Sequence, residues 1–219
     1  MSDYGNLQKL AYGLVVIMFV FYFVESLVIY KQELVVDDDG ASVELNYRLE
    51  EIRWELPDED MDGSRDISYD YIAFEEIEKV MQYMKNLALL LIIASAFLIW
   101  KIKEVADGSD DLEMVKRAGY AVSIIAILSA LYPVYAIPNA LEGEWRDGFF
   151  NEKDEGSFDY DTGFWGEQQV KGYGEFIDNG PTSSKSAPEA GWYLLVLGGI
   201  LGIVILRLTP KDTRVNDLD

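Results

Sequence analysis

The sequence contains no cysteine and no histidine. Without cysteine, the chain cannot form disulfides, thiolate nucleophiles, iron–sulfur clusters or cysteine-ligated zinc sites. Without histidine, it cannot form a Ser-His-Asp triad, a His-ligated haem or copper site, or a histidine general base. Basic residues are also scarce, with 18 Lys and Arg against 39 Asp and Glu. Nucleic acid is therefore not an expected partner, because phosphate contacts need clustered basic side chains.

Hydrophobic and charged residues are segregated along the chain. Hydrophobic residues make up 50% of the 219 positions, yet 26% are charged and the net charge is −21. Apolar residues gather in four runs, each with about the 20 residues that an α-helix needs to cross ~30 Å of hydrocarbon. These runs cover residues 10–30, 80–100, 118–138 and 191–209. The sequence therefore predicts a mainly α-helical membrane protein built on a four-transmembrane-helix bundle.

The first apolar run has two interpretations, the core of a cleaved signal peptide or an uncleaved transmembrane helix. It spans 21 residues, which is long for a signal-peptide core, and Glu25 interrupts it. No small-x-small cleavage site precedes Lys31. The uncleaved helix is therefore the favoured interpretation.

Two long segments between the runs hold the whole acidic excess. Residues 31–78 contain 17 acidic and 4 basic side chains, and residues 139–189 contain 12 and 4. The resulting charges, −13 and −8, together equal the net charge of the chain. Basic residues gather instead beside helix ends, at Lys101, Lys103, Lys116, Arg117, Arg207, Lys211 and Arg214. Because such residues mark the cytoplasmic side, the chain is predicted to be integral to the cell membrane. Both termini and the 101–117 connection are expected in the cytoplasm, and the two acidic loops outside the cell.

Both acidic loops contain patterns typical of β-strands. Apolar side chains in the first loop alternate with polar ones, first at odd and then at even positions: Val43, Leu45, Tyr47, Leu49, then Ile52, Trp54 and Leu56. A β-bulge at Glu50–Glu51 would explain the change of phase. A helical stripe through residues 45–56 is the alternative, and the strand is favoured. The second loop has eight glycines among many aromatics, which favours short strands and turns.

The predicted organisation combines these elements. Residues 1–30 form the N-terminus and first helix, 31–78 the first extracellular loop, 79–138 the second and third helices with a cytoplasmic hairpin at 101–117, 139–189 the second extracellular loop, and 190–219 the fourth helix and tail. The two loops are expected to form a small, partly β extracellular domain. This layout is similar to that of claudin-like tetraspan proteins in topology only. The W-G-L-W signature followed by two cysteines and the Cys-Cys-Gly of tetraspanins are absent, so no function is carried over.

One acidic segment resembles part of a calcium-binding loop. Residues 58–63 match D-x-D-x-D-G, the first half of an EF-hand-like loop in which alternate oxygens surround a hard cation. The candidate ligands are Asp58, Asp60, Asp62, Ser64 through its carbonyl, and Asp66. The match then ends, because Arg65 stands where an apolar residue is usual and Tyr69 where a bidentate Glu is required. A solvated acidic turn is therefore the simpler interpretation, and Asp37–Asp39 is a weaker acidic signal of the same kind.

Glu25 is the charged residue that the predicted spans place deepest. If its helix continues to Tyr30, Glu25 lies about 7 Å below the outer boundary, and Lys85 of the next helix reaches the same level. Charged groups at such depth need a partner or a wet cavity. We therefore expect an intramembrane Glu25–Lys85 pair, with a structural role favoured over a transport site.

Two further features concern helix packing and helix ends. Gly198 and Gly202 have the GxxxG spacing that lets helices approach closely, either within the bundle or against another subunit. Pro133 and Pro138 are expected to bend or end the third helix near the outer surface.

No catalytic constellation stands out, so the chain is not expected to be an enzyme, and a membrane enzyme is the least favoured hypothesis. The favoured hypothesis is a non-catalytic polytopic protein that presents an acidic ectodomain, with Ca²⁺ as its candidate ligand, for adhesion, assembly or scaffolding. The alternative is a cation channel, a transporter or an accessory subunit, since acidic loops concentrate cations. Expected partners are membrane lipid, other membrane subunits or further copies of this chain, and cations. The acid surplus also fits salty surroundings, such as the surface membrane of an archaeon.

A calcium titration of thermal unfolding separates the two interpretations of residues 58–66. A ligand at a hundredfold excess over its Kd stabilises the folded state by about 2.7 kcal/mol. A calcium site predicts a saturable rise in Tm that Asp60→Asn abolishes. An acidic turn predicts no shift, or an equal one with magnesium.

Overall fold

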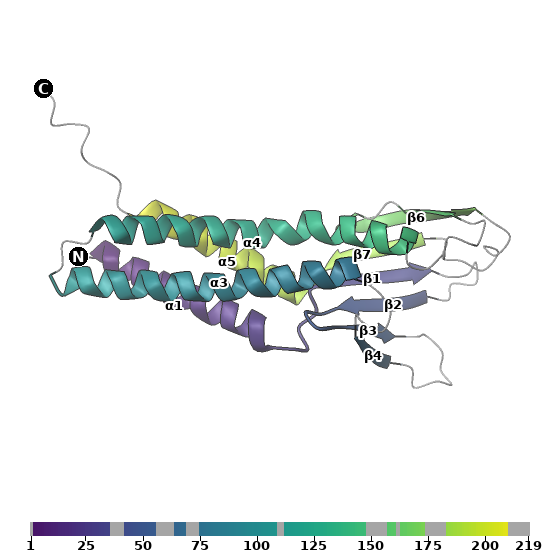
Figure 1. Ribbon diagram of the computed structural model, residues 1–219, viewed down its shortest axis with the longest axis horizontal. Helices are drawn as coiled ribbons and strands as arrows, with labels where there is room; N and C mark the ends of the chain where they lie inside the picture. Colours follow the sequence, from purple (N-terminus) through teal and green to yellow (C-terminus); the bar gives the residue numbers. More distant parts are fainter. Residues whose placement is uncertain are drawn as a thin grey trace, which may run out of the picture. The chain divides into compact units, whose positions relative to one another are not determined.

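The computed structural model is mainly helical, with a small antiparallel sheet, and describes residues 2–35, 42–55, 64–68, 75–108, 112–147, 157–160, 163–173 and 183–209. The helices are α1 (Ser2–Phe23), α3 (Glu75–Ala106), α4 (Leu112–Asp147) and α5 (Ala190–Leu208). The strands are β1 (Tyr30–Val35), β2 (Ser42–Tyr47), β3 (Glu51–Glu55), β4 (Ser64–Ser68), β5 (Ser157–Tyr160), β6 (Gly166–Tyr173) and β7 (Ser183–Pro188) (Figure 1). The chain divides into two compact units. The helical unit comprises residues 1–23, 86–131 and 194–219, and the sheet unit comprises residues 24–85 and 132–193.

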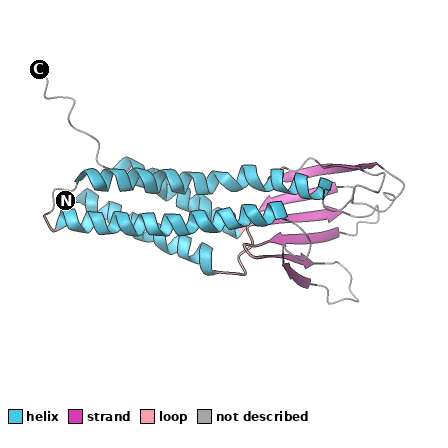
Figure 2. Ribbon diagram, viewed as in Figure 1, coloured by secondary structure: helices cyan, strands magenta, loops and turns pink. Residues whose placement is uncertain are grey.

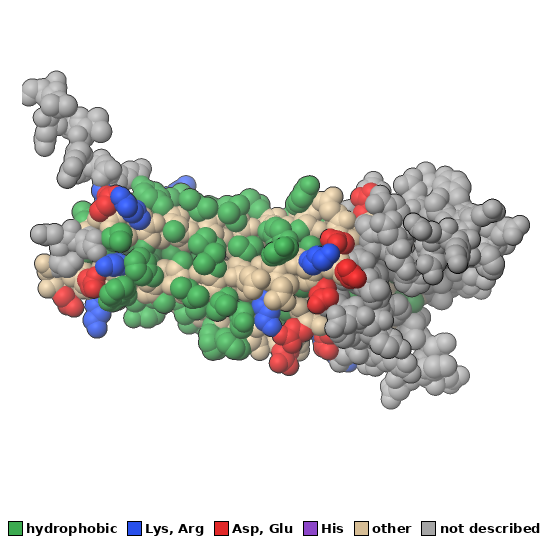
Figure 3. All heavy atoms as spheres, in the orientation of Figure 1, with side chains coloured by type: hydrophobic (Ala, Val, Ile, Leu, Met, Phe, Trp, Pro, Cys, Tyr) green, Lys and Arg blue, Asp and Glu red, His purple; other side chains and the backbone are tan. Residues whose placement is uncertain are grey.

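Among the described residues, three helices are long and apolar enough to cross a membrane, as expected of an integral membrane protein. They are Tyr4–Phe23 in α1, Leu112–Glu142 in α4 and Ala190–Leu208 in α5. Figure 3 shows hydrophobic side chains over the sides of the helical unit, with charged ones gathered at the end that holds the α3–α4 connection. Long apolar helices thus cover nearly all of the predicted spans at 118–138 and 191–209 and the first part of the span at 10–30. The run at 80–100 lies within α3, whose first turn carries three glutamates.

The first predicted span is displaced toward the N-terminus. Helix α1 ends at Phe23, and Glu25 lies in an exposed turn instead of inside a helix. At the end of the apolar run, Ile29 and Tyr30 are fully buried in the sheet unit. The prediction of a helix over residues 10–30 was wrong because hydropathy measures the tendency to leave water. It does not distinguish lipid from the core of a sheet.

Small residues bring α5 close to two neighbouring helices. A Cβ atom built on Gly198 would lie 2.8 Å from Met18 Cε in α1. One built on Gly202 would lie 2.7 Å from Ala126 Cβ in α4. Both glycines of the GxxxG pair therefore form contacts within the chain, which was one of the two predicted roles.

Helix α4 continues through both of its prolines. Pro133 and Pro138 lie inside the helix, which extends to Asp147. The predictions that these prolines end the helix and that residues 139–147 belong to a loop were wrong. Each proline removes one backbone donor, and a long helix can tolerate that loss when its remaining hydrogen bonds hold. Asn139 adds a bond, because its Nδ2 donates to the carbonyl of Tyr135 at 2.6 Å.

The described strands form one sheet in the order β4-β3-β2-β1-β7-β6-β5, and every neighbouring pair is antiparallel (Figure 2). Strands β1 to β4 come from the first acidic segment, and β5 to β7 come from the second. The two segments meet where β1 pairs with β7, from Tyr30 opposite Pro188 to Val35 opposite Ser183. The second loop does contain short strands, as its composition predicted.

The change of phase in the first segment marks a turn between strands. Tyr47 of β2 lies opposite Ile52 of β3, and both are fully buried. Between them, the Arg48 amide donates to the Glu51 carbonyl at 3.0 Å, and Arg48 Nη1 lies 2.7 Å from Glu51 Oε1. The favoured strand interpretation is confirmed. The predicted bulge at Glu50–Glu51 was wrong, because the chain reverses there.

Gly202→Ala should lower the free energy of unfolding by about 1–3 kcal/mol, because the new methyl group overlaps Ala126 in a packed helix contact. Gly13→Ala is the matched control, since its Cβ would meet its nearest neighbour, Leu201 Cδ1, at 3.9 Å. That variant should keep the wild-type Tm in detergent. Equal stability of the two variants would contradict the close packing of α5 and α4.

Candidate functional site

Polar side chains form a buried hydrogen-bond network at the centre of the sheet. Gln32 of β1 is fully buried and donates from Nε2 to Ser184 Oγ of β7 at 3.2 Å. The hydroxyl of Tyr47 in β2 donates to Gln32 Oε1 at 2.8 Å. Buried polar groups are costly unless they are paired, so these bonds favour one register of the three strands. Gln32 thereby connects the two chain segments that form the sheet.

Tyr30 lies beside this hydrogen-bond network and is fully buried. Its hydroxyl donates to the Gly163 carbonyl at 3.1 Å, and its ring stacks on Phe164 with centroids 5.5 Å apart. Burial raises the pKa of Tyr30 to about 12, and a hydrogen bond with Ser186 offsets part of that rise. The phenol is therefore kept neutral and serves as a hydrogen-bonding group.

Charged residues on β1 and β2 form a pair that is partly open to solvent. Lys31 Nζ lies 2.6 Å from Glu44 Oε2, and each side chain is about one-third exposed. The hydrogen bond to Glu44 raises the pKa of Lys31. Burial acts to raise the pKa of Glu44, but hydrogen bonds from Lys31 and Asn46 and the charge of Lys31 lower it overall. The pair adds little stability at this exposure.

The predicted partner of Lys85 was wrong. Lys85 of α3 pairs with Glu50, which lies in the turn between β2 and β3. Glu25 cannot occupy the predicted level inside a helix, because α1 has already ended at Phe23. The Glu50–Lys85 pair instead joins the start of α3 to the β2–β3 turn within the sheet unit.

Aromatic side chains gather where α5 begins. Phe164 is 5% exposed, and its ring centroid lies 5.5 Å from that of Trp192. The centroid of the Trp192 ring lies 6.2 Å from that of Trp165 and 5.1 Å from that of Tyr193. Trp165 and Tyr193 are 58% and 57% exposed. We call these four residues, Phe164, Trp165, Trp192 and Tyr193, the aromatic cluster.

The predicted calcium ligands are only partly within the described residues. Asp58, Asp60 and Asp62 lie outside them, as do Asp37–Asp39. Ser64 and Asp66 lie on strand β4, where Asp66 is opposite Arg53 of β3. No group of three or more acidic side chains in the described ranges is close enough to hold a metal ion. The calcium site therefore stays a prediction.

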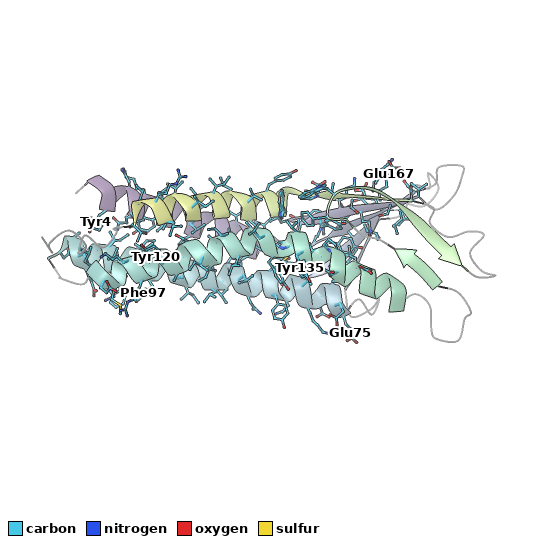
Figure 4. All side chains as sticks on the ribbon, turned by 90° about the horizontal axis from the view of Figure 1, so that it is seen from above. Tyr4, Glu75, Phe97, Tyr120, Tyr135 and Glu167 are labelled. Atoms are coloured by element: carbon cyan, nitrogen blue, oxygen red, sulfur yellow. The ribbon has the colours of Figure 1, made fainter. Side chains whose placement is uncertain are left out.

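Exposed charged groups lie on the two strands beyond β1. Glu167 of β6 is exposed and opposite exposed Lys185 of β7, and Figure 4 labels Glu167. At the start of α3, a hollow of about 390 Å³ is lined by Glu75, Glu78, Lys79, Gln82 and Tyr83. All five side chains come from one helix. These surfaces are suited to contact with solvent, ions or a partner.

Sequence reasoning missed the buried polar centre. Tyr30, Gln32 and Leu34 alternate on one face of β1, but this period of two directly follows a long apolar run. Ser184 and Ser186 are also buried, although their segment is rich in serine and has the composition of a loop. The signal in the sequence that could have predicted strand β1 is the period of two in residues 30–35, where Tyr30, Gln32 and Leu34 share one face.

Comparison with known proteins gives no family assignment: no protein-family model matches the sequence, and no curated protein is significantly similar to it. The functional argument therefore depends on the chain's own geometry.

Tyr30→Phe should reduce the loss of stability at high pH. The pKa of Tyr30 is about 12 in the folded state and 10.0 as the ordinary value. In the unfolded chain, Tyr30 therefore loses its proton at a lower pH than in the folded chain. The stability that the raised pKa of Tyr30 provides is lost as pH rises from 10 to 12. Wild type should lose about 2–3 kcal/mol more than Tyr30→Phe between pH 9 and 12.

Denaturant unfolding in detergent at several pH values measures this difference. The same slope in wild type and Tyr30→Phe would contradict a buried, neutral Tyr30.

Proposed function

We propose that this chain is a non-catalytic, four-pass membrane protein whose acidic sheet unit serves assembly with other membrane components. The observation that carries the proposal is the pairing of β1 with β7. It combines two segments of the chain, separated by two long helices, into one sheet. Strand β1 begins seven residues after α1 ends, and β7 ends two residues before α5 begins. The sheet is therefore attached by short connections to two candidate membrane spans.

Helix α3 is proposed as the fourth span. Residues 87–100 contain no charged side chain. Leu89, Leu90, Ile93 and Phe97 on this stretch are between 37% and 58% exposed. A contiguous apolar surface of this kind is unusual in a water-soluble protein and is expected where lipid covers a helix. Trp100 is 54% exposed, and Lys101 Nζ lies 4.7 Å from its ring centroid, a combination typical of a membrane interface.

The orientation of the chain follows from its charges. Lys101 and Lys103 lie in the last two turns of α3, which ends at Ala106. Arg117 lies in the first two turns of α4, and Arg207 lies in the last turn of α5. The positive-inside rule assigns these ends to the cytoplasm. The acidic segments, with charges of −13 and −8, then face the outside.

A role in assembly is favoured over catalysis because the buried polar side chains of the sheet serve its structure. Gln32, Tyr47, Ser184 and Tyr30 bond to one another or to the backbone inside the sheet, where they stabilise its register. The exposed charges of the sheet, such as Glu167 and Lys185, are available to a partner. We propose other membrane subunits or further copies of this chain as that partner, with cations, including Ca²⁺, as ligands of the acidic surface.

Site-specific photo-crosslinking in native membranes tests the assembly role. A benzophenone amino acid in place of Glu167 or Lys185 should give discrete adducts, either at twice the 24.8 kDa mass of the chain or with one other protein. The same amino acid in place of Ile124, which is 57% exposed on α4, is the control for lipid-facing positions and should give no discrete band. The absence of adducts from both sheet positions would contradict the proposal.

An ion-flux assay tests the alternative function. Liposomes that contain the purified chain should show no cation flux above that of protein-free liposomes. Flux that increases with the amount of protein would replace the assembly role with a channel or transporter.

A further inference from the structure

The turn before β6 carries a tryptophan, Trp165, that is mostly exposed. Phe164 and Trp165 are adjacent, yet Phe164 is 5% exposed and Trp165 is 58% exposed. The chain reverses direction in this turn, and Gly166 adopts a φ of 110°, which side-chain-bearing residues rarely adopt. Phe164 fixes the turn through its stacking on Tyr30. The exposed Trp165 ring packs edge-on against the buried Phe164 ring, with centroids 5.4 Å apart.

Backbone hydrogen bonds fix the position of the aromatic cluster at the start of α5. The Glu189 amide donates to the Ile29 carbonyl at 3.0 Å, and the Gly191 amide donates to the Val28 carbonyl at 2.8 Å. A Cβ atom on Gly191 would lie 3.0 Å from the Val28 carbonyl oxygen, so the close approach requires glycine. Trp192 and Tyr193 follow directly and are held in the first turn of the helix.

The length of α5 determines the depth of these residues, given the membrane span of the proposed function. Nineteen residues extend about 28 Å, close to the thickness of the hydrocarbon core. The first turn of α5 must therefore lie at the boundary between hydrocarbon and headgroups. The headgroup layer adds about 5–7 Å on each side. The Trp165 ring, 6.2 Å from that of Trp192, is close enough to reach this layer.

We propose that Trp165 is a membrane anchor that inserts into the headgroup layer of the phospholipid bilayer beside α5. Tryptophan suits this position because its ring is largely apolar and its N–H can donate to lipid carbonyls. Trp165 belongs to a turn of the second acidic segment, so its insertion fixes the β6 end of the sheet to the membrane surface. The sheet unit would thus contact lipid directly, in addition to the lipid contacts of the membrane-spanning helices.

Fluorescence quenching by nitroxide-labelled lipids tests the anchor. Wild type and Trp165→Phe are reconstituted into phosphatidylcholine vesicles with the nitroxide either near the headgroup or near the chain ends. The difference between the two proteins isolates the Trp165 emission. That emission should lose about half or more of its intensity to the shallow nitroxide and clearly less to the deep one, and it should resist aqueous iodide.

Quenching of Trp165 by iodide would overturn the anchor, and so would resistance to both lipid and aqueous quenchers, which indicates cover by protein. A matched control separates this failure from that of the proposed function. The chain has no cysteine, so Ile200→Cys accepts a single fluorophore on an exposed position of α5. Quenching of that fluorophore by the deep nitroxide supports the span whatever Trp165 does. Its absence would contradict the span and, with it, the depth argument for Trp165.

Discussion

The pairing of β1 with β7 is the contact on which the sheet unit depends. These strands lie in the middle of the sheet order, with β2, β3 and β4 on one side and β6 and β5 on the other. Gln32 and Ser184, which are 152 residues apart, bond at the centre of the pair. Two backbone bonds then continue the contact into the start of α5. One register therefore determines the packing of both acidic segments and the position of the aromatic cluster.

Hydropathy was a good guide to the helices and a poor guide to their ends. The apolar runs predicted α1, α4 and α5, and alternation in the first acidic segment predicted its strands. The apolar stretch that begins in α1 was assigned wholly to lipid, although Ile29 and Tyr30 are buried in the sheet unit. Burial by lipid and burial by protein have the same signature in composition. Prolines were likewise overestimated as helix ends, because α4 contains two of them.

The candidate site could not be predicted from the sequence, because its members acquire their roles through distant partners. In the sequence, Gln32 and Ser184 resemble exposed loop residues. Only the pairing of β1 with β7 shows that they are hydrogen-bonded to each other. Lys85 was expected to pair with Glu25, but it pairs with Glu50, because the β2–β3 turn brings Glu50 to α3. By contrast, the glycines of α5 were identified from spacing alone, since close helix packing needs small residues at fixed intervals.

The central position of β1 and β7 has a consequence for biosynthesis. Strand β1 follows α1 and β7 directly precedes α5, with α3 and α4 between them, so the two strands can pair only after the ribosome has synthesised both long helices and β7. Until then, β1 has an open edge that can pair with any exposed strand of another chain. The sheet has a high contact order for this reason and is expected to form late. Because the Glu189 and Gly191 amides bond to the Ile29 and Val28 carbonyls, closure of the sheet and docking of the start of α5 are expected to occur together.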